Sequence, residues 1–322
     1  MSIESTIAGI SLAVISAMSL SAGNIWQAQG VEIASATRGQ RSMAMALIRT
    51  KVWLLGTVMF GLAIVLQMGS LAFAPLMLVQ PIGVLALVFS IFINAKISGK
   101  KPSISIIRAV VIALIGVASY VTIASLITSQ STITDAQLIA VLVALCVALL
   151  IAAVIRLLSK GSSRHAPILF VFLGGMFSAF VATLGKTVLL RVEALLKDHH
   201  FTVDSDGVLT LFCLIGLGIA SALSIYFTQT AYTCNPSDVV VAGLTVIDPA
   251  IAVVLGITVL HEANGAPLWA LLLMAFAGAV AVYGVVRLAQ AETATTPSDS
   301  SASKEPDSST LTQDGAHTPS AE

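Results

Sequence analysis

The sequence predicts an all-α membrane protein with about nine transmembrane helices, and three observations lead to this fold class. Hydrophobic residues make up 57% of the 322 residues, whereas charged residues make up only 10%. A soluble domain carries about 25% charged residues, so this chain has too few to cover its surface in water. Long apolar runs recur along the chain, and a segment crossing lipid must be helical to satisfy its backbone.

Nine apolar runs approach the roughly 20 residues that a helix needs to cross the hydrocarbon core. Tryptophan, which prefers the membrane interface, lies near run ends at Trp26, Trp53 and Trp269. The predicted spans are 6–27, 53–73, 76–95, 104–127, 136–158, 167–189, 208–231, 239–260 and 267–288.

The charges of the connections predict the orientation of these spans. The connections at residue 74 and over 128–135 contain no Lys or Arg, whereas the alternate connections are basic. Positively charged loops stay on the cytoplasmic side. We therefore expect a plasma membrane protein with its amino terminus outside and its carboxyl terminus in the cytoplasm. The basic residues are Arg38, Arg41, Arg49, Lys51, Lys96, Lys100, Lys101, Arg108, Arg156, Lys160 and Arg164.

Two segments are predicted to lie outside the membrane. Residues 191–206 form a mixed-charge external loop, in which the adjacent His199 and His200 are expected to be solvated rather than metal ligands. Residues 290–322 are rich in Ser, Thr, Pro and acidic residues, and such a composition cannot bury enough apolar surface to fold. We expect a transmembrane domain over 1–289 and a disordered cytoplasmic tail after it.

A degenerate internal repeat is predicted over residues 6–158 and 166–288. In each copy a helix with a glutamine is followed by a proline at a turn and by an apolar helix broken by a second proline. Five helices separate the starts of the two copies, so the second copy is inverted, as in many transporters that bind substrate near the membrane midplane. Alternatively, Pro and Gly are simply frequent in membrane helices. The matched residues are Gln67, Pro75 and Pro81, and Gln229, Pro236 and Pro249.

Three segments resemble the drug/metabolite transporter superfamily. Residues 74–85, with the pattern Ala-Pro-x-x-Leu-Val-x-Pro-x-Gly-x-Leu, resemble the NIPA-type magnesium transporters of that superfamily. Residues 231–262 resemble its EamA-type members, in which a carboxylate often precedes the proline and a glutamate closes the helix, as Asp248 and Glu262 do here. Residues 174–190 resemble the family helix that carries a lysine, here Lys186. The resemblance extends to the start of the tail.

The resemblance implies a secondary transporter that moves a small solute by alternating access, with proton coupling through Asp248 as one hypothesis. The chain departs from the NIPA pattern where Leu62 follows Gly61 in place of a glutamate, and where 94–101 carries three lysines in place of an acidic residue. Divalent cations need oxygen ligands, and carboxylates above all. A magnesium transporter and a non-transporting membrane scaffold for an envelope pathway remain alternatives.

Asp248 is the strongest candidate for a binding residue, because a charge in the middle of a span is costly and usually functional. We expect it to face a midplane cavity, beside a helix break at Pro249. Lys186 lies near the outer end of its span, where it either pairs with Asp248 or extends to the lipid headgroups.

Uncharged polar residues within the spans provide further candidates. Such residues either hydrogen-bond neighbouring helices or contact substrate, and those at the end of the first span line a vestibule or mark the membrane interface. They are Gln67, Gln80, Thr228 and Gln229 within spans, and Asn24 and Gln27 at the end of the first. Pro81 is expected to break the third span.

The sequence predicts no enzyme, no cofactor and no metal site. It contains no Gly-x-Ser-x-Gly, no nucleotide-binding Gly-x4-Gly-Lys-Ser/Thr and no His-Glu-x-x-His. The 16 basic and 16 acidic residues balance, which gives no indication of a nucleic-acid partner. The expected partners are membrane lipids and a small-molecule or ion substrate, and a homodimer is left open.

Overall fold

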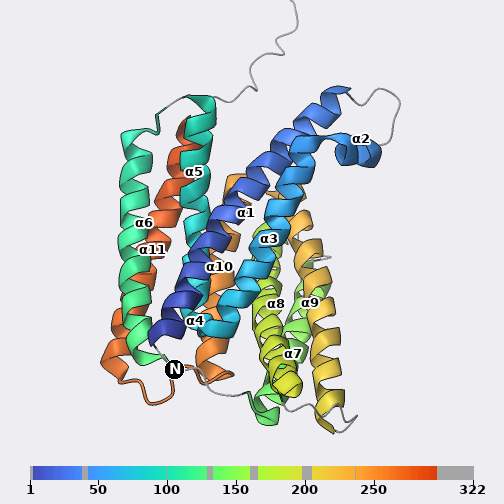
Figure 1. The fold of residues 1–322 in the computed structure, drawn as a ribbon, viewed down its shortest axis with the longest axis vertical. Helices are drawn as coiled ribbons and strands as arrows, with labels where there is room; N and C mark the ends of the chain where they lie inside the picture. The colour runs from blue at the N-terminus through green and yellow to red at the C-terminus, as the bar shows by residue number, and fades with distance from the viewer. Residues whose placement is uncertain are drawn as a thin grey trace, which may run out of the picture.

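The structure is a computed structural model that describes residues 3–37, 43–99, 101–128, 133–159, 166–197, 205–235 and 237–295. Throughout this described part the regular structure is helical, without strands (Figure 1). Nine helices within it are long and apolar enough to cross a membrane. The predicted fold class is therefore confirmed, and the chain is a multi-pass α-helical membrane protein.

Every predicted span corresponds to one of these helices, and the third span consists of three consecutive pieces, α4, η1 and α5. The helices are α1 (Ile3–Thr37), α2 (Met43–Arg49), α3 (Lys51–Phe73), α4 (Leu76–Val79), the 3₁₀ helix η1 (Gln80–Val84), α5 (Leu85–Ser98), α6 (Ile104–Ile127), α7 (Asp135–Ser159), α8 (Ala166–Lys197), α9 (Ser205–Cys234), α10 (Ser237–Thr258) and α11 (Leu268–Thr295).

Several helices extend beyond their predicted spans. α8 continues through residues 191–197, which were predicted as loop, and α11 continues to Thr295, past the predicted start of the tail. Apolar run length locates the hydrocarbon core, whereas good helix formers such as Ala, Leu, Glu and Lys continue a helix into the polar interface. His199, His200 and the tail from residue 296 lie outside the described residues.

Glycine and alanine allow α6 and α11 to pack closely. A Cβ atom added to Gly116 would lie 2.3 Å from the backbone nitrogen of Ala281, and one added to Gly284 would lie 2.4 Å from that of Ala113. Small residues permit such close approach in membrane helices, where packing drives association. Small residues of the fourth and ninth predicted spans therefore lie against each other in the fold. The helices α5, α6 and α11 form one side of the bundle (Figure 1).

The two sequence halves interlock in space. α1 packs mainly on α3, and α8 packs mainly on α9. α7, which the prediction assigns to the first repeat, packs against α8 and α9 of the second. α11, the last helix of the second repeat, packs against α6 of the first. The boundary between sequence halves is therefore not a boundary between separate bundles.

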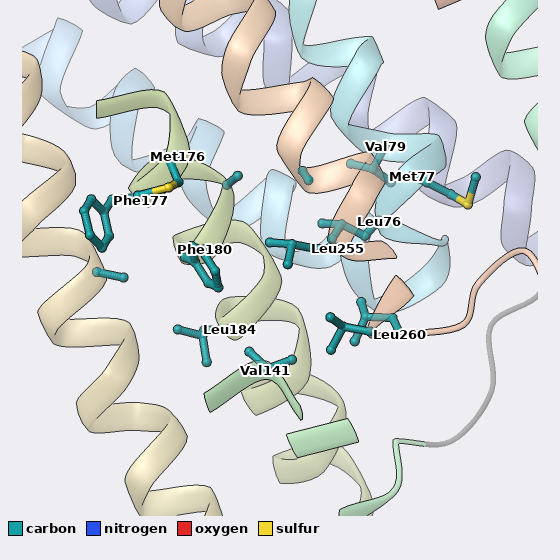
Figure 2. Close-up of a cluster of buried hydrophobic side chains, with 14 of the residues drawn as sticks. Leu76, Met77, Val79, Val141, Met176, Phe177, Phe180, Leu184, Leu255 and Leu260 are labelled. Carbon is teal, nitrogen blue, oxygen red and sulfur yellow. The ribbon is translucent and has the colours of Figure 1, made fainter. Parts of the chain in front are cut away.

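A buried apolar cluster joins α4, α7, α8 and the end of α10. Leu76 of α4, Leu184 of α8 and Leu255 of α10 belong to it. Figure 2 shows these side chains converging from helices that are distant in sequence. This cluster holds the start of α4 beside α8 and beside the residues that follow α10.

The chain breaks between α3 and α4 for a local reason. Ala74 precedes Pro75, and the proline ring disfavours the helical conformation for the residue before it. Ala74 accordingly has φ −140° and ψ 154°, and α3 ends at Phe73. The α-helix also gives way to the 3₁₀ helix η1 at Gln80, directly before Pro81, without an interruption of the span.

The break predicted at Pro249 is not found, because α10 runs through this residue as one helix. Proline removes one hydrogen bond from a helix, here the bond to the carbonyl of Thr245. Membrane helices tolerate this loss where neighbouring groups support the backbone. The prediction of a broken helix there is therefore wrong, although the helix lacks the backbone hydrogen bond to Thr245.

Candidate functional site

The candidate site follows one helix, α8, which holds two carboxylates of the second half. Ser178 and Lys186 lie on α8 about two turns apart, which corresponds to about 12 Å along the helix axis. Ser178 contacts Asp248 of α10, and Lys186 contacts Glu262, which follows α10. Each carboxylate therefore has a separate partner on the same helix.

Glu262 satisfies the backbone at the start of α4. The first N–H groups of a helix have no partner within it, and Pro75 at the N-cap makes no side-chain capping bond. Oε1 of Glu262 accepts from the backbone N–H of Leu76 at 2.7 Å, and Oε2 accepts from that of Met77 at 2.9 Å. One side chain thus caps a helix that lies 185 residues away in sequence.

Lys186 completes this cluster. Its Nζ donates to Oε1 of Glu262 at 2.6 Å and to the carbonyl oxygen of Ala74 at 3.1 Å. Lys186 is only 2% exposed and Glu262 only 3%. One buried ion pair therefore binds the backbone on both sides of the break, at the carbonyl group before it and at the two N–H groups after it.

The turn after α10 points Glu262 inward. His261 has φ 55°, a left-handed conformation that a residue with a side chain adopts rarely. The backbone N–H of Glu262 then donates to the carbonyl oxygen of Gly256 at 2.9 Å. A Cβ atom on Gly256 would lie 2.9 Å from Oε2 of Glu262. Glycine at position 256 therefore leaves the space that the carboxylate occupies.

Gln137 of α7 attaches this turn to a further helix. Its Nε2 donates to the carbonyl oxygen of Leu260 at 2.8 Å, and its Oε1 accepts from the backbone N–H of Thr134 at 3.0 Å. The turn is therefore held by α4 through Glu262 and by the start of α7 through Gln137.

Asp248 has a much sparser environment. Its Oδ2 accepts a hydrogen bond of 2.6 Å from the hydroxyl of Ser178. Its Oδ1 is buried and has no hydrogen-bond partner among the residues that the structure describes. Gly175 permits the close approach of α8 and α10, since a Cβ atom there would lie 2.7 Å from the side chain of Ile247. The carboxylate thus retains unused capacity to accept hydrogen bonds.

A cavity of about 300 Å³ lies on another face of α10, between η1, α6, α10 and α11. Val246, Pro249 and Val253 line it, whereas Asp248 does not. Adjacent residues of a helix point about 100° apart, because 3.6 residues make a turn. The expectation that Asp248 faces a cavity is therefore not met by this cavity, since Asp248 faces α8.

Lys186 also differs from both of its predicted alternatives. It neither pairs with Asp248 nor extends to the headgroups, because Glu262 lies at its Nζ. Glu262 was noted from the family resemblance as the residue that closes a helix, but no role followed from that. A buried lysine requires a buried carboxylate, and the sequence offers two. Helix periodicity cannot select between them, because Glu262 lies in a turn.

The remaining polar candidates are scattered over the molecule. Gln80 is buried in η1, Gln67 is half-buried in α3, and Thr228 is half-buried in α9. Gln229 and Asn24 are exposed. Within the described part of the chain, none of them hydrogen-bonds to either carboxylate. The last candidate is Gln27, which donates to the hydroxyl of Thr57 at 3.4 Å on an exposed surface.

Comparison of the chain with protein-family models, with curated proteins and with solved structures finds no match to any of them. Across the described residues there is also no group of three or more His, Cys, Asp or Glu side chains that could hold a metal ion. Membership of the drug/metabolite transporter superfamily accordingly stays a prediction from the sequence resemblance.

Proposed function

We propose that the protein is a secondary transporter that moves a small solute by alternating access, with Asp248 as the residue that binds the substrate or a coupling ion. The unpartnered, buried Oδ1 of Asp248 carries this proposal. Buried polar atoms are nearly always hydrogen-bonded, and each exception in the interior requires an explanation. An ionisable residue in the middle of a membrane span is costly and by default functional.

The pairing of helices supports an inverted repeat, on which alternating access would depend. The first and second spans, α1 and α3, pack together, as do the sixth and seventh, α8 and α9. α1 also packs on the third span through α5, and α8 packs on the eighth span, α10. α6 and α11, the fourth and ninth spans, pack on each other. The contacts of α1 thus recur at α8 with an offset of five spans, and the contact of α6 with α11 joins corresponding spans of the two copies.

The geometry favours an organic solute or a proton over a divalent cation. Calcium and magnesium ligands lie within about 2.6 Å of the ion. Asp248 and Glu262 contact α8 at positions about 12 Å apart along its axis, and both oxygens of Glu262 are already occupied by backbone and lysine donors. The two carboxylates therefore cannot share one ion in this arrangement. From the loop charges, we also propose that the chain lies in the plasma membrane with its amino terminus outside.

Cysteine accessibility tests the proposal without knowledge of the substrate. Ser178 is replaced by cysteine in a background in which Cys146, Cys213 and Cys234 are serine. Membrane-impermeant methanethiosulfonate is then applied to either side of oriented vesicles. Alternating access predicts that Ser178→Cys is labelled from both sides, because the region around Asp248 opens to each side in turn.

The matched control is Val254→Cys, on the exposed apolar surface of α10. A thiol facing lipid does not ionise, so we expect no labelling from either side. If the protein is a non-transporting scaffold, Ser178→Cys should likewise be labelled from neither side. Labelling of Ser178→Cys from neither side, or from one side only, would therefore contradict a transporter.

A further inference from the structure

The end of the bundle at which α7 leads into α8 has a surplus of basic residues. The connection between these helices contains Lys160 and Arg164 and no acidic residue. The junction of α9 and α10 lies at the same end, because the side-chain amide of Asn235 donates to the carbonyl oxygen of Pro167 at 2.9 Å. Asp238, in the first turn of α10, is the acidic residue of that junction. In a membrane, a basic surplus of this kind attracts anionic lipid headgroups.

Arg156 of α7 lies at this end, at the edge of a membrane span. The candidate span Asp135–Leu157 ends one residue after it. Its side chain is exposed, and it takes part in neither of the ion pairs found among the described residues. Beside it, Leu157 of α7 and Ile225 of α9 are exposed apolar side chains. The guanidinium group therefore lies where a lipid-facing apolar surface meets the headgroup region.

Aromatic rings and a hydroxyl group hold this guanidinium in place. Nη2 of Arg156 donates to the hydroxyl oxygen of Tyr226 on α9 at 2.9 Å. The central carbon of the guanidinium lies 5.8 Å from the ring centroid of Phe170 on α8 and 6.0 Å from that of Tyr226. Cations are attracted to ring faces at such distances. Phe170 is in turn stacked on Phe227, with centroids 6.3 Å apart. A side chain that is already positioned loses less entropy when it binds a ligand.

Most hydrogen-bond donors of this pair are unused. A guanidinium has five N–H donors, and the bond to Tyr226 is the one hydrogen bond that Arg156 makes within the described part of the chain. The hydroxyl of Tyr226 accepts that bond, so its own proton can be donated to a ligand. A guanidinium matches two oxygens of a phosphate at once, and a hydroxyl beside it can donate to the same group. The arrangement therefore fits a phosphate.

We propose that Arg156 and Tyr226 bind the phosphate group of an anionic phospholipid, in the leaflet on the side of the α7–α8 connection. The guanidinium and the hydroxyl select the phosphate, and the basic surplus selects a lipid with a net negative charge. Leu157 and Ile225 contact its acyl chains. The site requires a membrane but no transport, so it goes beyond the transporter proposal and does not rest on it.

Native mass spectrometry of the full chain in detergent tests this site. The protein is mixed with equal amounts of phosphatidylglycerol and phosphatidylcholine that carry the same acyl chains, and the bound amount of each lipid is measured. We expect a preference for phosphatidylglycerol. Arg156→Gln should weaken its binding about tenfold, because hydrogen bonds between charged groups are lost. Tyr226→Phe removes one further donor and should weaken it roughly fivefold.

Two variants separate the site from general surface charge. Arg108→Gln is the matched control, since Arg108 is an exposed arginine at the start of α6 on the same predicted side, and within the described residues it lies over no aromatic ring. The same charge is removed, and we expect the preference for phosphatidylglycerol to change little. Arg156→Lys keeps the charge but lacks the planar guanidinium, so its binding should fall between that of Arg156→Gln and that of the unaltered protein.

The proposal is overturned if Arg108→Gln weakens binding as much as Arg156→Gln, or if the two lipids bind equally. It is also overturned if inorganic phosphate in excess displaces phosphatidylglycerol, because the site would then be one for free phosphate. None of these results bears on the labelling of Ser178→Cys. Failure of this site and failure of the transporter proposal are therefore distinguishable.

Discussion

Glu262 and Asp248 are carboxylates held by the same helix, yet their surroundings differ in kind. Glu262 accepts from two backbone N–H groups and from Lys186, so each of its oxygens is engaged. Asp248 accepts one bond from Ser178, and its other oxygen has no partner within the described residues. The comparison teaches that a buried charge alone does not identify the working residue. In the proposed function, the working residue is the carboxylate with unused hydrogen-bonding capacity, Asp248.

The difference follows from which buried donor groups each carboxylate satisfies. The backbone N–H groups at the start of α4 and the ammonium group of Lys186 are buried among apolar side chains. Without an acceptor, each of them would cost several kcal/mol of stability. Glu262 removes these costs together and completes the backbone where α3 gives way to α4. Asp248 satisfies only a hydroxyl, which a neutral side chain could also do. We therefore propose that Glu262 stabilises the fold and that Asp248 serves the function.

The largest expected effect is the loss of Glu262. Glu262→Ala leaves Lys186 and the N–H groups of Leu76 and Met77 buried without their acceptor. Breaking one partner of a buried pair costs about 3–5 kcal/mol. We expect a strongly lowered midpoint of thermal unfolding in detergent, and partial recovery when Lys186→Met is added. The control is Glu32→Gln on the exposed surface of α1, for which we expect no change.

Gly256→Ala is expected to rank second. The added Cβ atom would lie 2.9 Å from Oε2 of Glu262 and 3.4 Å from the Cβ of Met77. Overpacking of this kind costs about 1–3 kcal/mol. Gly218→Ala on α9 is the matched control, since nothing lies within 4 Å of its added Cβ among the described residues. An equal response of the two variants in thermal unfolding would show that Glu262 does not need the space at position 256.

Asp248→Asn is expected to leave thermal stability within about 1 kcal/mol of the unaltered protein, because a neutral amide still accepts from Ser178 and is less costly to bury. Labelling of Ser178→Cys from at least one side should nevertheless be reduced, because the substitution changes the group that would drive the conformational cycle. A loss of stability as large as that of Glu262→Ala would make Asp248 a structural residue and remove the distinction.

The smallest effect is expected at a partly exposed ion pair. Arg191 of α8 and Asp135 of α7 are joined at 2.9 Å, and the side chain of Asp135 is 52% exposed, whereas that of Arg191 is 13% exposed. Exposed pairs contribute about 0–1 kcal/mol and weaken with salt. We expect Asp135→Asn to lower the unfolding midpoint slightly, and less at high ionic strength. An effect comparable to that of Glu262→Ala would show that burial does not separate the two pairs.

Much of the fold could be predicted because span length is a local property. A helix needs about 20 apolar residues to cross the bilayer, and the runs 53–73 and 104–127 reappear almost unchanged as α3 and α6. The ends of α8 and α11 were not predictable in this way, since helix formation does not stop where the hydrocarbon ends. The continuity of α10 at Pro249 depends on neighbouring helices, which a single sequence does not specify.

The site could be predicted only in part. Asp248 was identifiable because a charge in a span is expensive wherever the helix lies. The partner of Lys186 was not, because it depends on how the turn after α10 folds back over α4. That turn relies on the left-handed conformation of His261 and on the space at Gly256. These are properties of three-dimensional packing, and the resemblance that pointed to Glu262 assigned it no partner.

Reaction with dicyclohexylcarbodiimide tests the central distinction most directly. This apolar reagent modifies protonated, reachable carboxyl groups within membranes, and mass spectrometry of the purified protein locates the product. We predict modification of Asp248, its disappearance in Asp248→Asn, and no modification of Glu262, whose oxygens are held by Lys186 and the backbone of α4. Modification of Glu262 with Asp248 left unreacted would contradict the account.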